Sequence, residues 1–463
     1  MRSFQNRFRS AFKSLHDSIR SKPRRRLSQF DCSRSLAAEF LEDRCLLAAG
    51  AFDTSFAGIG QKTVAFDRGG SLSDVGEAIA IQSDGKILVA GAVQVSSSDT
   101  DFGVTRLKSD GSIDTTFGTN GKVTIAFDFV TNGFDKATAI AVQADGKIVV
   151  VGQASFGDSA RRTFALARLT SAGRLDTTFS DDGKALIHFG SDSSATGVAI
   201  QSNGKIVVSG TEYKDFSGKD MAVARFNSNG TLDTTFNGVG FRTVAFDIGG
   251  SKEEYCNAIS LQADGKIVLA GTAHTGGSNV FEFAVARLTT SGSLDTTFDG
   301  DGKKTIAFDH GVASAVAVSS SGKIVVAGRA NVASDQDFAV ARLNSNGSLD
   351  STFDGDGKKT IAFDLGGSNN DQANAVKIQS DGKIVVAGSA RVSFGVSDFA
   401  VARLNSNGSL DTSFDGDGKR RSSLSGDDEA RGMALQSNGR IVLAGYSNAV
   451  GDNDFGIIRL LNS

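Results

Sequence analysis

The chain has 463 residues, of which 40% are hydrophobic and 22% charged, with 55 glycines, one proline and no tryptophan. This composition is typical of a globular protein, and three cysteines do not supply a disulfide framework. No apolar stretch is long enough to suggest a membrane span. Residues 1–48 carry 11 Lys and Arg against 5 Asp and Glu, so from a total net charge of −3 the remaining body is acidic. An acidic body argues against nucleic-acid binding, which needs a basic groove.

Residues 1–48 are predicted to be a basic, disordered leader or targeting segment. Five Lys and Arg lie between Arg20 and Arg26, and no apolar core of a standard signal peptide follows them. The segment Leu41-Glu42-Asp43-Arg44-Cys45-Leu46-Leu47 is similar to the Leu-Glu-x-Arg-x-Leu-Leu segment near the N-termini of planctomycete surface and exported proteins. Asp43 stands where that motif usually has proline. The resemblance implies an extracellular or cell-surface location, with a cytoplasmic location as the alternative.

Residues 49–463 are predicted to form one repeat-built domain. Each of seven units contains an alternating strand that ends in an arginine, and the arginines are Arg106, Arg168, Arg225, Arg287, Arg342, Arg403 and Arg459. A polar turn and the motif Asp-Thr-Thr-Phe, or a close variant, follow the first six, beginning at Asp114, Asp176, Asp233, Asp295, Asp350 and Asp411. A further copy begins at Asp53, before the first arginine, so the chain is out of phase with its own repeat.

Four strands are predicted in each unit from period-2 alternation and β-branched residues. In the second unit they are 122–127, 137–143, 147–151 and 163–169, and Asp145-Gly146 between two of them favours a tight hairpin. A four-stranded unit that recurs at a fixed period indicates a β-propeller, because each small sheet buries its faces against its neighbours. We therefore predict an all-β fold, a seven-bladed propeller of antiparallel blades.

The phase offset predicts how the ring closes. If the alanine-rich run of each unit is the innermost strand, the run 61–66 is an outer strand without a blade of its own, and the last blade lacks one. We expect the N-terminal strand to pair with the last blade, which removes two open edges. The outer strand 419–424 departs from the repeat, and we expect it to be frayed.

The motifs Asp-Gly-Lys-Ile-Val-Val-Ala-Gly, Phe-Ala-Val-Ala-Arg-Leu and Gly-Ser-Leu-Asp-Thr-Thr-Phe resemble those of the delta-60 repeat family, whose units are taken to form β-propellers. The resemblance covers roughly residues 51–463. It implies architecture, since the family has no general activity to carry over.

The repeated arginines and aspartates are interpreted as structural. In Phe338-Ala339-Val340-Ala341-Arg342 the arginine shares a strand face with two apolar residues, so it points between blades and needs a partner. The motif aspartate eight residues later, Asp350 here, is the expected partner. A ligand site at these arginines is the disfavoured alternative.

Cofactors are not expected, with calcium as the open alternative. Asp295, Asp299 and Asp301 lie close together among glycines and could present several oxygens to Ca²⁺. The favoured interpretation is a turn, because Asp and Gly suit turns and the full calcium-loop spacing is missing. The four histidines do not recur in the repeat, and no nucleophile elbow or phosphate loop is present.

Function is expected on the face that collects the connections that differ between units, because loops on a rigid scaffold usually carry binding residues. These connections hold all three tyrosines, Tyr213, Tyr255 and Tyr446. The favoured hypothesis is a monomeric, non-enzymatic scaffold that binds a protein or glycan there. The alternatives are a hydrolase or lyase with its site at the mouth of the central channel, and a purely structural component of the cell envelope.

Overall fold

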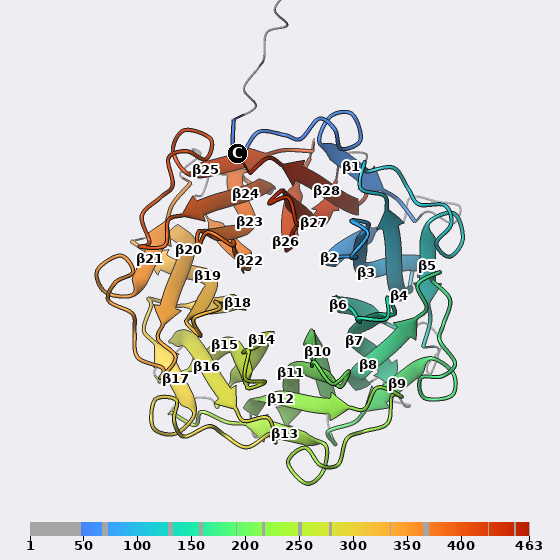
Figure 1. Cartoon of the computed structure of the whole chain (residues 1–463), viewed down its shortest axis with the longest axis horizontal. Helices are drawn as coiled ribbons and strands as arrows, with labels where there is room; N and C mark the ends of the chain where they lie inside the picture. Colours follow the sequence, from blue (N-terminus) through green and yellow to red (C-terminus); the bar gives the residue numbers. More distant parts are fainter. Residues whose placement is uncertain are drawn as a thin grey trace, which may run out of the picture. The chain divides into compact units, whose positions relative to one another are not determined.

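The computed structural model describes residues 48–462 except 67–72, 128–132, 157–160, 191, 215–217, 249–251, 277–279, 334, 364–369, 425 and 449–450. The chain divides into residues 1–46 and residues 47–463, and the second unit is described here. It contains seven four-stranded antiparallel sheets arranged as blades around a central axis, which confirms the predicted propeller (Figure 1). The described residues contain no helix that is long and apolar enough to cross a membrane. The predicted leader lies outside the described residues, apart from Ala48.

Each blade consists of an inner, a second, a third and an outer strand. The inner strands are β2 (Asp74–Ile81), β6 (Lys136–Val142), β10 (Asp192–Ile200), β14 (Glu254–Leu261), β18 (Val312–Val318), β22 (Asp371–Ile378) and β26 (Asp428–Leu435). The second strands are β3 (Ile87–Ser96), β7 (Ile148–Phe156), β11 (Ile206–Lys214), β15 (Ile267–His274), β19 (Ile324–Val332), β23 (Ile384–Ser393) and β27 (Ile441–Ser447).

The third strands are β4 (Asp99–Leu107), β8 (Arg161–Leu169), β12 (Gly218–Phe226), β16 (Phe281–Leu288), β20 (Asp335–Leu343), β24 (Val396–Leu404) and β28 (Asp454–Leu460). The outer strands are β5 (Lys122–Ile125), β9 (Lys184–Ile187), β13 (Phe241–Val244), β17 (Lys303–Ile306), β21 (Lys358–Ile361), β25 (Lys419–Ser422) and β1 (Gln61–Val64). Blades 1 to 6 begin with β2, β6, β10, β14, β18 and β22, and blade 7 combines β26, β27 and β28 with β1.

Ring closure follows the prediction from the phase of the repeat. The N-terminal strand β1 pairs antiparallel with β28, the last strand of the chain, from Gln61 opposite Ile458 to Val64 opposite Phe455. A bridge between Phe52 and Leu460 extends this pairing toward the N-terminus. The first and last described strands therefore share one blade, and β28 has no open edge along its paired residues.

Two expectations about strand length were wrong. Strand β25, expected to be frayed, pairs with β24 over four residues as the other outer strands do, because backbone hydrogen bonds do not depend on its altered side chains. The second and third strands also extend beyond their predicted ends, as in β7 and β8, which reach Phe156 and Arg161. Residues expected in long loops therefore belong to extended hairpins.

The hydrophobic core lies between blades. Each of the seven apolar clusters combines residues of two neighbouring blades, such as Val386 and Leu404 of blade 6 with Val325 and Val340 of blade 5. Because both sheet faces pack against neighbours, the strands read as continuous apolar runs, and all six residues from Phe399 to Leu404 are buried.

A β-bulge in every inner strand shapes the wall of the central channel. The bulged residues are Glu77, Thr138, Thr196, Asn257, Ser314, Asn374 and Arg431, and all of them line the channel. Several bind the backbone of the next blade: Thr196 Oγ1 donates to the Cys256 carbonyl oxygen at 2.7 Å, and Asn257 Nδ2 donates to that of Ala313 at 2.7 Å. The bulges thus link the inner strands around the axis.

The Val-Ala-Gly motif is explained by the same bulges. A Cβ atom on Gly388 of β23 would lie 1.9 Å from the carbonyl oxygen of Gln372 in β22. No side chain can occupy that space, so the glycine permits the close approach of the two strands at the bulge.

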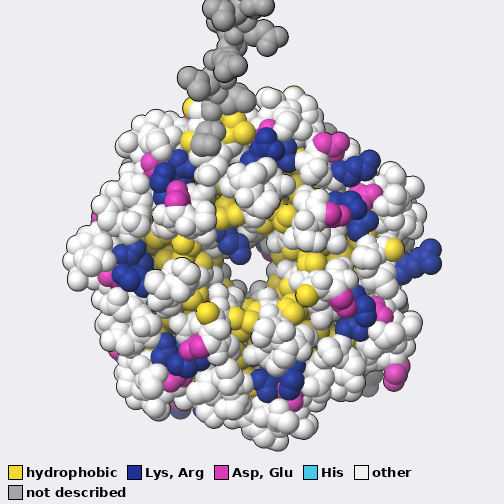
Figure 2. Space-filling view, in the orientation of Figure 1, with side chains coloured by type: hydrophobic (Ala, Val, Ile, Leu, Met, Phe, Trp, Pro, Cys, Tyr) yellow, Lys and Arg dark blue, Asp and Glu magenta, His cyan; other side chains and the backbone are white. Residues whose placement is uncertain are grey.

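The propeller has two distinct faces. The constant face carries the turns between inner and second strands, such as 379–383, and the Asp-Thr-Thr-Phe segments, such as 411–414. The variable face carries the turns between second and third strands, such as 393–396, and the connections from outer strands to the next blade. Figure 2 shows basic and acidic side chains next to one another at intervals around the ring, and apolar side chains nearer the central opening.

Candidate functional site

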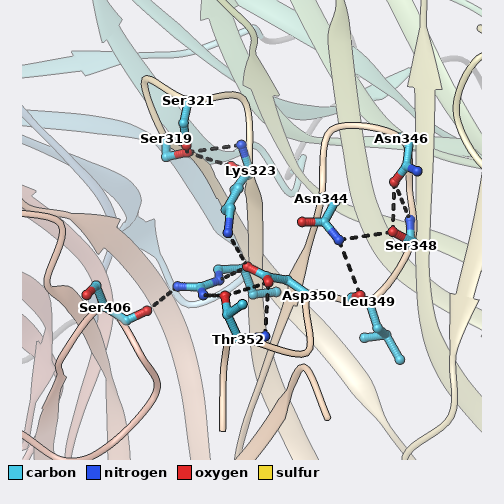
Figure 3. Close-up of polar contacts among 11 residues, drawn as sticks. Ser319, Ser321, Lys323, Asn344, Asn346, Ser348, Leu349, Asp350, Thr352 and Ser406 are labelled. Atoms are coloured by element: carbon cyan, nitrogen blue, oxygen red, sulfur yellow. Dashed lines mark hydrogen bonds and ion pairs between the residues drawn. The ribbon is translucent and has the colours of Figure 1, made fainter. Parts of the chain in front are cut away.

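The repeated arginines lie between blades on the constant face, and each contacts the Asp-Thr-Thr-Phe segment that follows it. In blade 5, Arg342 Nε donates to Asp350 Oδ2 at 2.7 Å, and Nη2 donates to Thr352 Oγ1 at 3.0 Å. The guanidinium carbon lies 4.9 Å from the centre of the Phe353 ring, and Nη1 donates to the Ser406 carbonyl oxygen of blade 6. The motif therefore holds an arginine that ties its blade to the next (Figure 3).

The ion pair recurs in every blade. The Nε–Oδ2 distances are 2.6–2.9 Å in the pairs Arg106–Asp114, Arg168–Asp176, Arg225–Asp233, Arg287–Asp295, Arg342–Asp350, Arg403–Asp411 and Arg459–Asp53. The structure thus brings together all the arginines and aspartates that the sequence analysis paired. The pairing of Asp53 with Arg459 was not predicted, although the early copy of the motif pointed to it.

A second cation binds each motif aspartate. Lys323 Nζ lies 2.6 Å from Asp350 Oδ2 (Figure 3), and equivalent cations lie 2.6–3.5 Å from the other aspartates: Lys86, Lys147, Lys205, Lys266, Lys383 and Arg440. Burial alone would raise the pKa of Asp295, but hydrogen bonds from Thr297 and Lys266, together with the charge of Arg287, lower this pKa to about 2. These groups satisfy one another, so blade packing accounts for them.

The three calcium candidates bind separate cations. Asp295 belongs to the pairs just described, Asp299 Oδ2 lies 3.2 Å from Lys304 Nζ, and Asp301 Oδ2 lies 4.0 Å from Lys303 Nζ. Within the described ranges, no group of three or more His, Cys, Asp or Glu side chains could hold a metal ion. The carboxylates therefore act in turns and ion pairs here.

The tyrosines lie at the variable-face ends of strands and not in loops, which corrects their expected placement, and two of them contact the same lysine. Tyr213 on β11 and Tyr255 on β14 belong to neighbouring blades and flank Lys219, whose Nζ lies 5.8 Å and 4.5 Å from the two ring centres. Lys219 Nζ also lies 3.1 Å from Glu253 Oε1. Because the lysine fills the space between the rings, this cluster offers little room to a ligand.

Tyr446, on β27 in blade 7, belongs to a different polar network. Its hydroxyl donates to Glu429 Oε2 at 3.2 Å, while Glu429 Oε1 accepts from Asn374 Nδ2 at 3.1 Å. Arg431 Nη2 lies 3.4 Å from Glu429 Oε2, and its Nη1 lies 2.6 Å from Glu77 Oε1 in blade 1. The network connects blades 6, 7 and 1 at the variable-face end of the channel.

A pocket of about 300 Å³ opens beside Tyr446 on the variable face. Its lining comes from blades 5, 6 and 7 and is polar apart from one glycine: Arg329, Gln336, Asn370, Gln372, Ser389, Arg391, Gly395, Ser397, Asp427, Glu429 and Tyr446. Phe394, next to Gly395 at the tip of the β23–β24 hairpin, has 96% of its surface exposed. The polar pocket is therefore lined in part by a hairpin tip that also carries an exposed aromatic residue.

Lys377 in the central channel is a second feature that was not predicted from the sequence. Lys377 of β22 occupies the register position where the other inner strands carry Ala80, Ala141, Ala199, Ser260, Ala317 and Ala434. The side chain is exposed to the channel, but the channel wall surrounds it, and this burial lowers the pKa of the ammonium group. The departure from a small residue was the available signal.

Solved structures similar to this chain include three propeller-sized proteins. They are a protein of unknown function from Dyadobacter fermentans (12% identity, TM-score 0.46, 87% of this chain and 100% of that chain), the polysaccharide lyase Uly1 (13%, 0.46, 90% and 97%), and Sqt1 from Chaetomium thermophilum (14%, 0.45, 86% and 97%). At these identities and scores the likenesses carry no argument about activity. No curated protein matches the sequence.

A family model described as "Domain of unknown function (DUF5122) beta-propeller" matches seven segments, 82–117, 143–179, 201–236, 262–298, 319–353, 379–414 and 436–463. Each segment runs from the turn after an inner strand through the second and third strands, and the first six continue to the phenylalanine of the Asp-Thr-Thr-Phe motif. Together the segments cover more than half of the chain, one in each blade. The chain therefore belongs to the β-propeller family of unknown function DUF5122.

Proposed function

We propose that this propeller is an exported or surface-attached scaffold that binds a saccharide, without catalysis, in the pocket beside Tyr446. The observation that carries the proposal is the combination of the polar pocket with the exposed side chain of Phe394, which adjoins the lining residue Gly395 in the chain. Sugars present hydroxyl groups that need both donors and acceptors, and amide, guanidinium, hydroxyl and carboxylate groups supply both. Their apolar ring faces pack on exposed aromatic side chains.

The pocket is also better suited to binding a small ligand than to binding the surface of another protein. It is concave, it is built on strands of three blades, and its polar groups converge from different elements. The Tyr213–Lys219–Tyr255 cluster on the same face lacks such a hollow, because Lys219 lies between the rings.

Catalysis at the channel mouth, as in a lyase or hydrolase, is less well supported. Burial raises the pKa of the Tyr446 hydroxyl, and the charges of Glu429 and Asp427 raise it further, whereas a tyrosine base would need a lowered pKa. Glu429 is already engaged by Tyr446, Asn374 and Arg431. Binding without turnover is the function that these groups favour.

A glycan array with the full-length protein, followed by calorimetry on the best ligand, tests the proposal. We expect Phe394→Ala to weaken binding about tenfold, which corresponds to about 1.4 kcal/mol. Phe134→Ala is the matched control, because Phe134 is also an exposed aromatic residue, 60% accessible, and does not line this pocket. Absence of any saccharide ligand, or equal effects of the two substitutions, would contradict the proposal.

A further inference from the structure

The pocket contains an arginine unlike the seven that tie the blades together. Arg329 is half-buried on β19, and its Nη1 donates to the neutral oxygen Oε1 of Gln372 in the next blade. Over the part of the chain that the structure describes, no carboxylate oxygen lies within 4 Å of the Arg329 guanidinium nitrogens, whereas each of the seven repeated arginines has an aspartate within 2.9 Å.

The other blades do not have a cation at the position that Arg329 occupies in the repeat. The residues at the same register position in the other second strands are uncharged: Ala92, Gln153, Thr211, Thr272, Ser389 and Tyr446. Blade construction therefore does not explain the charge. A half-buried guanidinium without an anionic partner is costly, so it points to a partner that the chain does not supply.

The nearby carboxylates are held by other groups. Glu429 accepts from Tyr446 and Asn374 and lies beside Arg431, and Asp427 Oδ1 accepts the backbone N–H of Ser397 at 2.8 Å. Burial lowers the pKa of Arg329, and the charge of Glu429 offsets this effect only in part. Arg329 thus lines the pocket with a positive charge that no described carboxylate pairs directly.

We infer, on the basis of the proposed function, that the pocket selects a saccharide that contains a uronic acid residue. In this inference Arg329 binds the carboxylate of that residue. The planar guanidinium matches a carboxylate in two parallel hydrogen bonds, which gives geometry as well as charge. Arg391 lines the same pocket from β23 and adds a second positive charge, and the exposed Phe394 adjoins the lining residue Gly395 in the chain.

Calorimetry with trigalacturonic acid and its carboxyl-reduced counterpart tests this inference on the full-length protein. We expect the acidic trisaccharide to bind at least tenfold more tightly than the reduced one. Arg329→Gln should abolish this preference, so that the variant binds the two trisaccharides with affinities within about twofold of each other. Phe394→Ala should weaken both ligands by a similar factor, because it removes contact with the ring and not with the carboxylate.

The outcomes separate the two proposals. If both trisaccharides bind equally well, the carboxylate inference fails and saccharide binding stands. If no saccharide binds, the proposed function fails and the inference with it. Preference for a sulfated neutral trisaccharide over the uronate would also overturn the carboxylate assignment. If Arg329→Gln does not fold, Arg329→Lys is used instead, because it keeps the charge but not the planar guanidinium. The inference then requires that Arg329→Lys reduces the preference for the acidic trisaccharide.

Discussion

At the scale of single residues, arginine occurs in two distinct environments in this protein. The repeated arginines, such as Arg342, are buried and bound by aspartate, threonine and the carbonyl oxygen of the next blade. Arg329 is half-buried, binds only a neutral amide among the described side chains, and lines the pocket. The partners, and not the residue type, distinguish the repeated arginines from Arg329.

Substitution of Asp350 should destabilise the protein more than substitution of Arg342. Asp350→Ala leaves both Arg342 and Lys323 without their anion, whereas Arg342→Ala leaves Asp350 bound to Lys323. Breaking a buried pair typically costs about 3 to 5 kcal/mol, and we expect Arg342→Ala to fall at or below the lower end. Urea unfolding measures both losses. Equal losses would contradict the role of Lys323 as a second partner of Asp350, and negligible losses would show that the pair does not hold the blades together.

Glu254 should make stability depend on pH near neutrality. It is fully buried at the start of β14, where burial, followed by the charges of Asp220 and Asp247, raises its pKa from 4.5 to about 7. The folded protein then binds this proton more tightly than the unfolded chain does. The free energy of unfolding should therefore fall by up to about 3 kcal/mol as the pH rises from 4.5 through 7.

Glu254→Gln is the matched variant for this effect, since the amide stays neutral at every pH. Urea unfolding at pH 5 and pH 8 should show a decrease for the wild type that the variant lacks. Parallel pH dependence of the two proteins would mean that Glu254 does not titrate in this range.

At the scale of elements, one short N-terminal segment closes the ring. Strand β1 completes blade 7, Phe52 bridges to Leu460, and Asp53 binds Arg459 at 2.7 Å. This segment thus supplies backbone hydrogen bonds, apolar contact and the seventh ion pair. Without it, β28 would present an open edge and a buried cation without its partner.

Two deletions test the closure. Removal of residues 1–47 keeps Asp53 and β1 and should leave the melting temperature nearly unchanged. Removal of residues 1–70 deletes both, and we expect a markedly lower melting temperature or aggregation, measured by calorimetry and size-exclusion chromatography. A 1–70 deletion as stable and monomeric as the 1–47 deletion would contradict closure by β1.

At the scale of the whole molecule, a regular ring carries an irregular variable face. The constant face repeats the same contacts between blades, whereas the variable face differs from blade to blade and carries the pocket between blades 5, 6 and 7. A ligand there contacts three blades that the repeated ion pairs hold together. The proposed export of the protein rests on the leader, residues 1–48, and is tested separately.

A reporter fused to residues 1–50 should leave the cytoplasm of a planctomycete host if the leader is an export address. Replacement of Leu46 and Leu47 by aspartate should retain the reporter and serves as the control. The charged run Glu42-Asp43-Arg44 makes spontaneous partition into a bilayer poor, so a dedicated receptor is required. Fractionation with reporter activity measures the outcome, and retention of the intact fusion would place the propeller inside the cell.

Much of the architecture could be predicted from the sequence because the same motifs recur in every unit. The number of blades, the antiparallel hairpins, closure by β1 and the partner of Arg342 all depend on spacings that recur along the chain. Strand ends were less predictable: in β7 and β8 the hairpin continues into polar residues, where pairing between backbones outweighs side-chain pattern.

The pocket could not be predicted, because its residues have no shared pattern along the chain. Arg329, Gln372 and Glu429 belong to three different units and meet only because the ring places their blades side by side. The arrangement of the blades likewise brings Tyr213 and Tyr255 to the same lysine, Lys219, whereas Tyr446, in blade 7, belongs to a separate network. Because the motifs repeat, the sequence predicts the local structure of each blade. Contacts between unlike residues of different blades depend on the geometry of the closed ring.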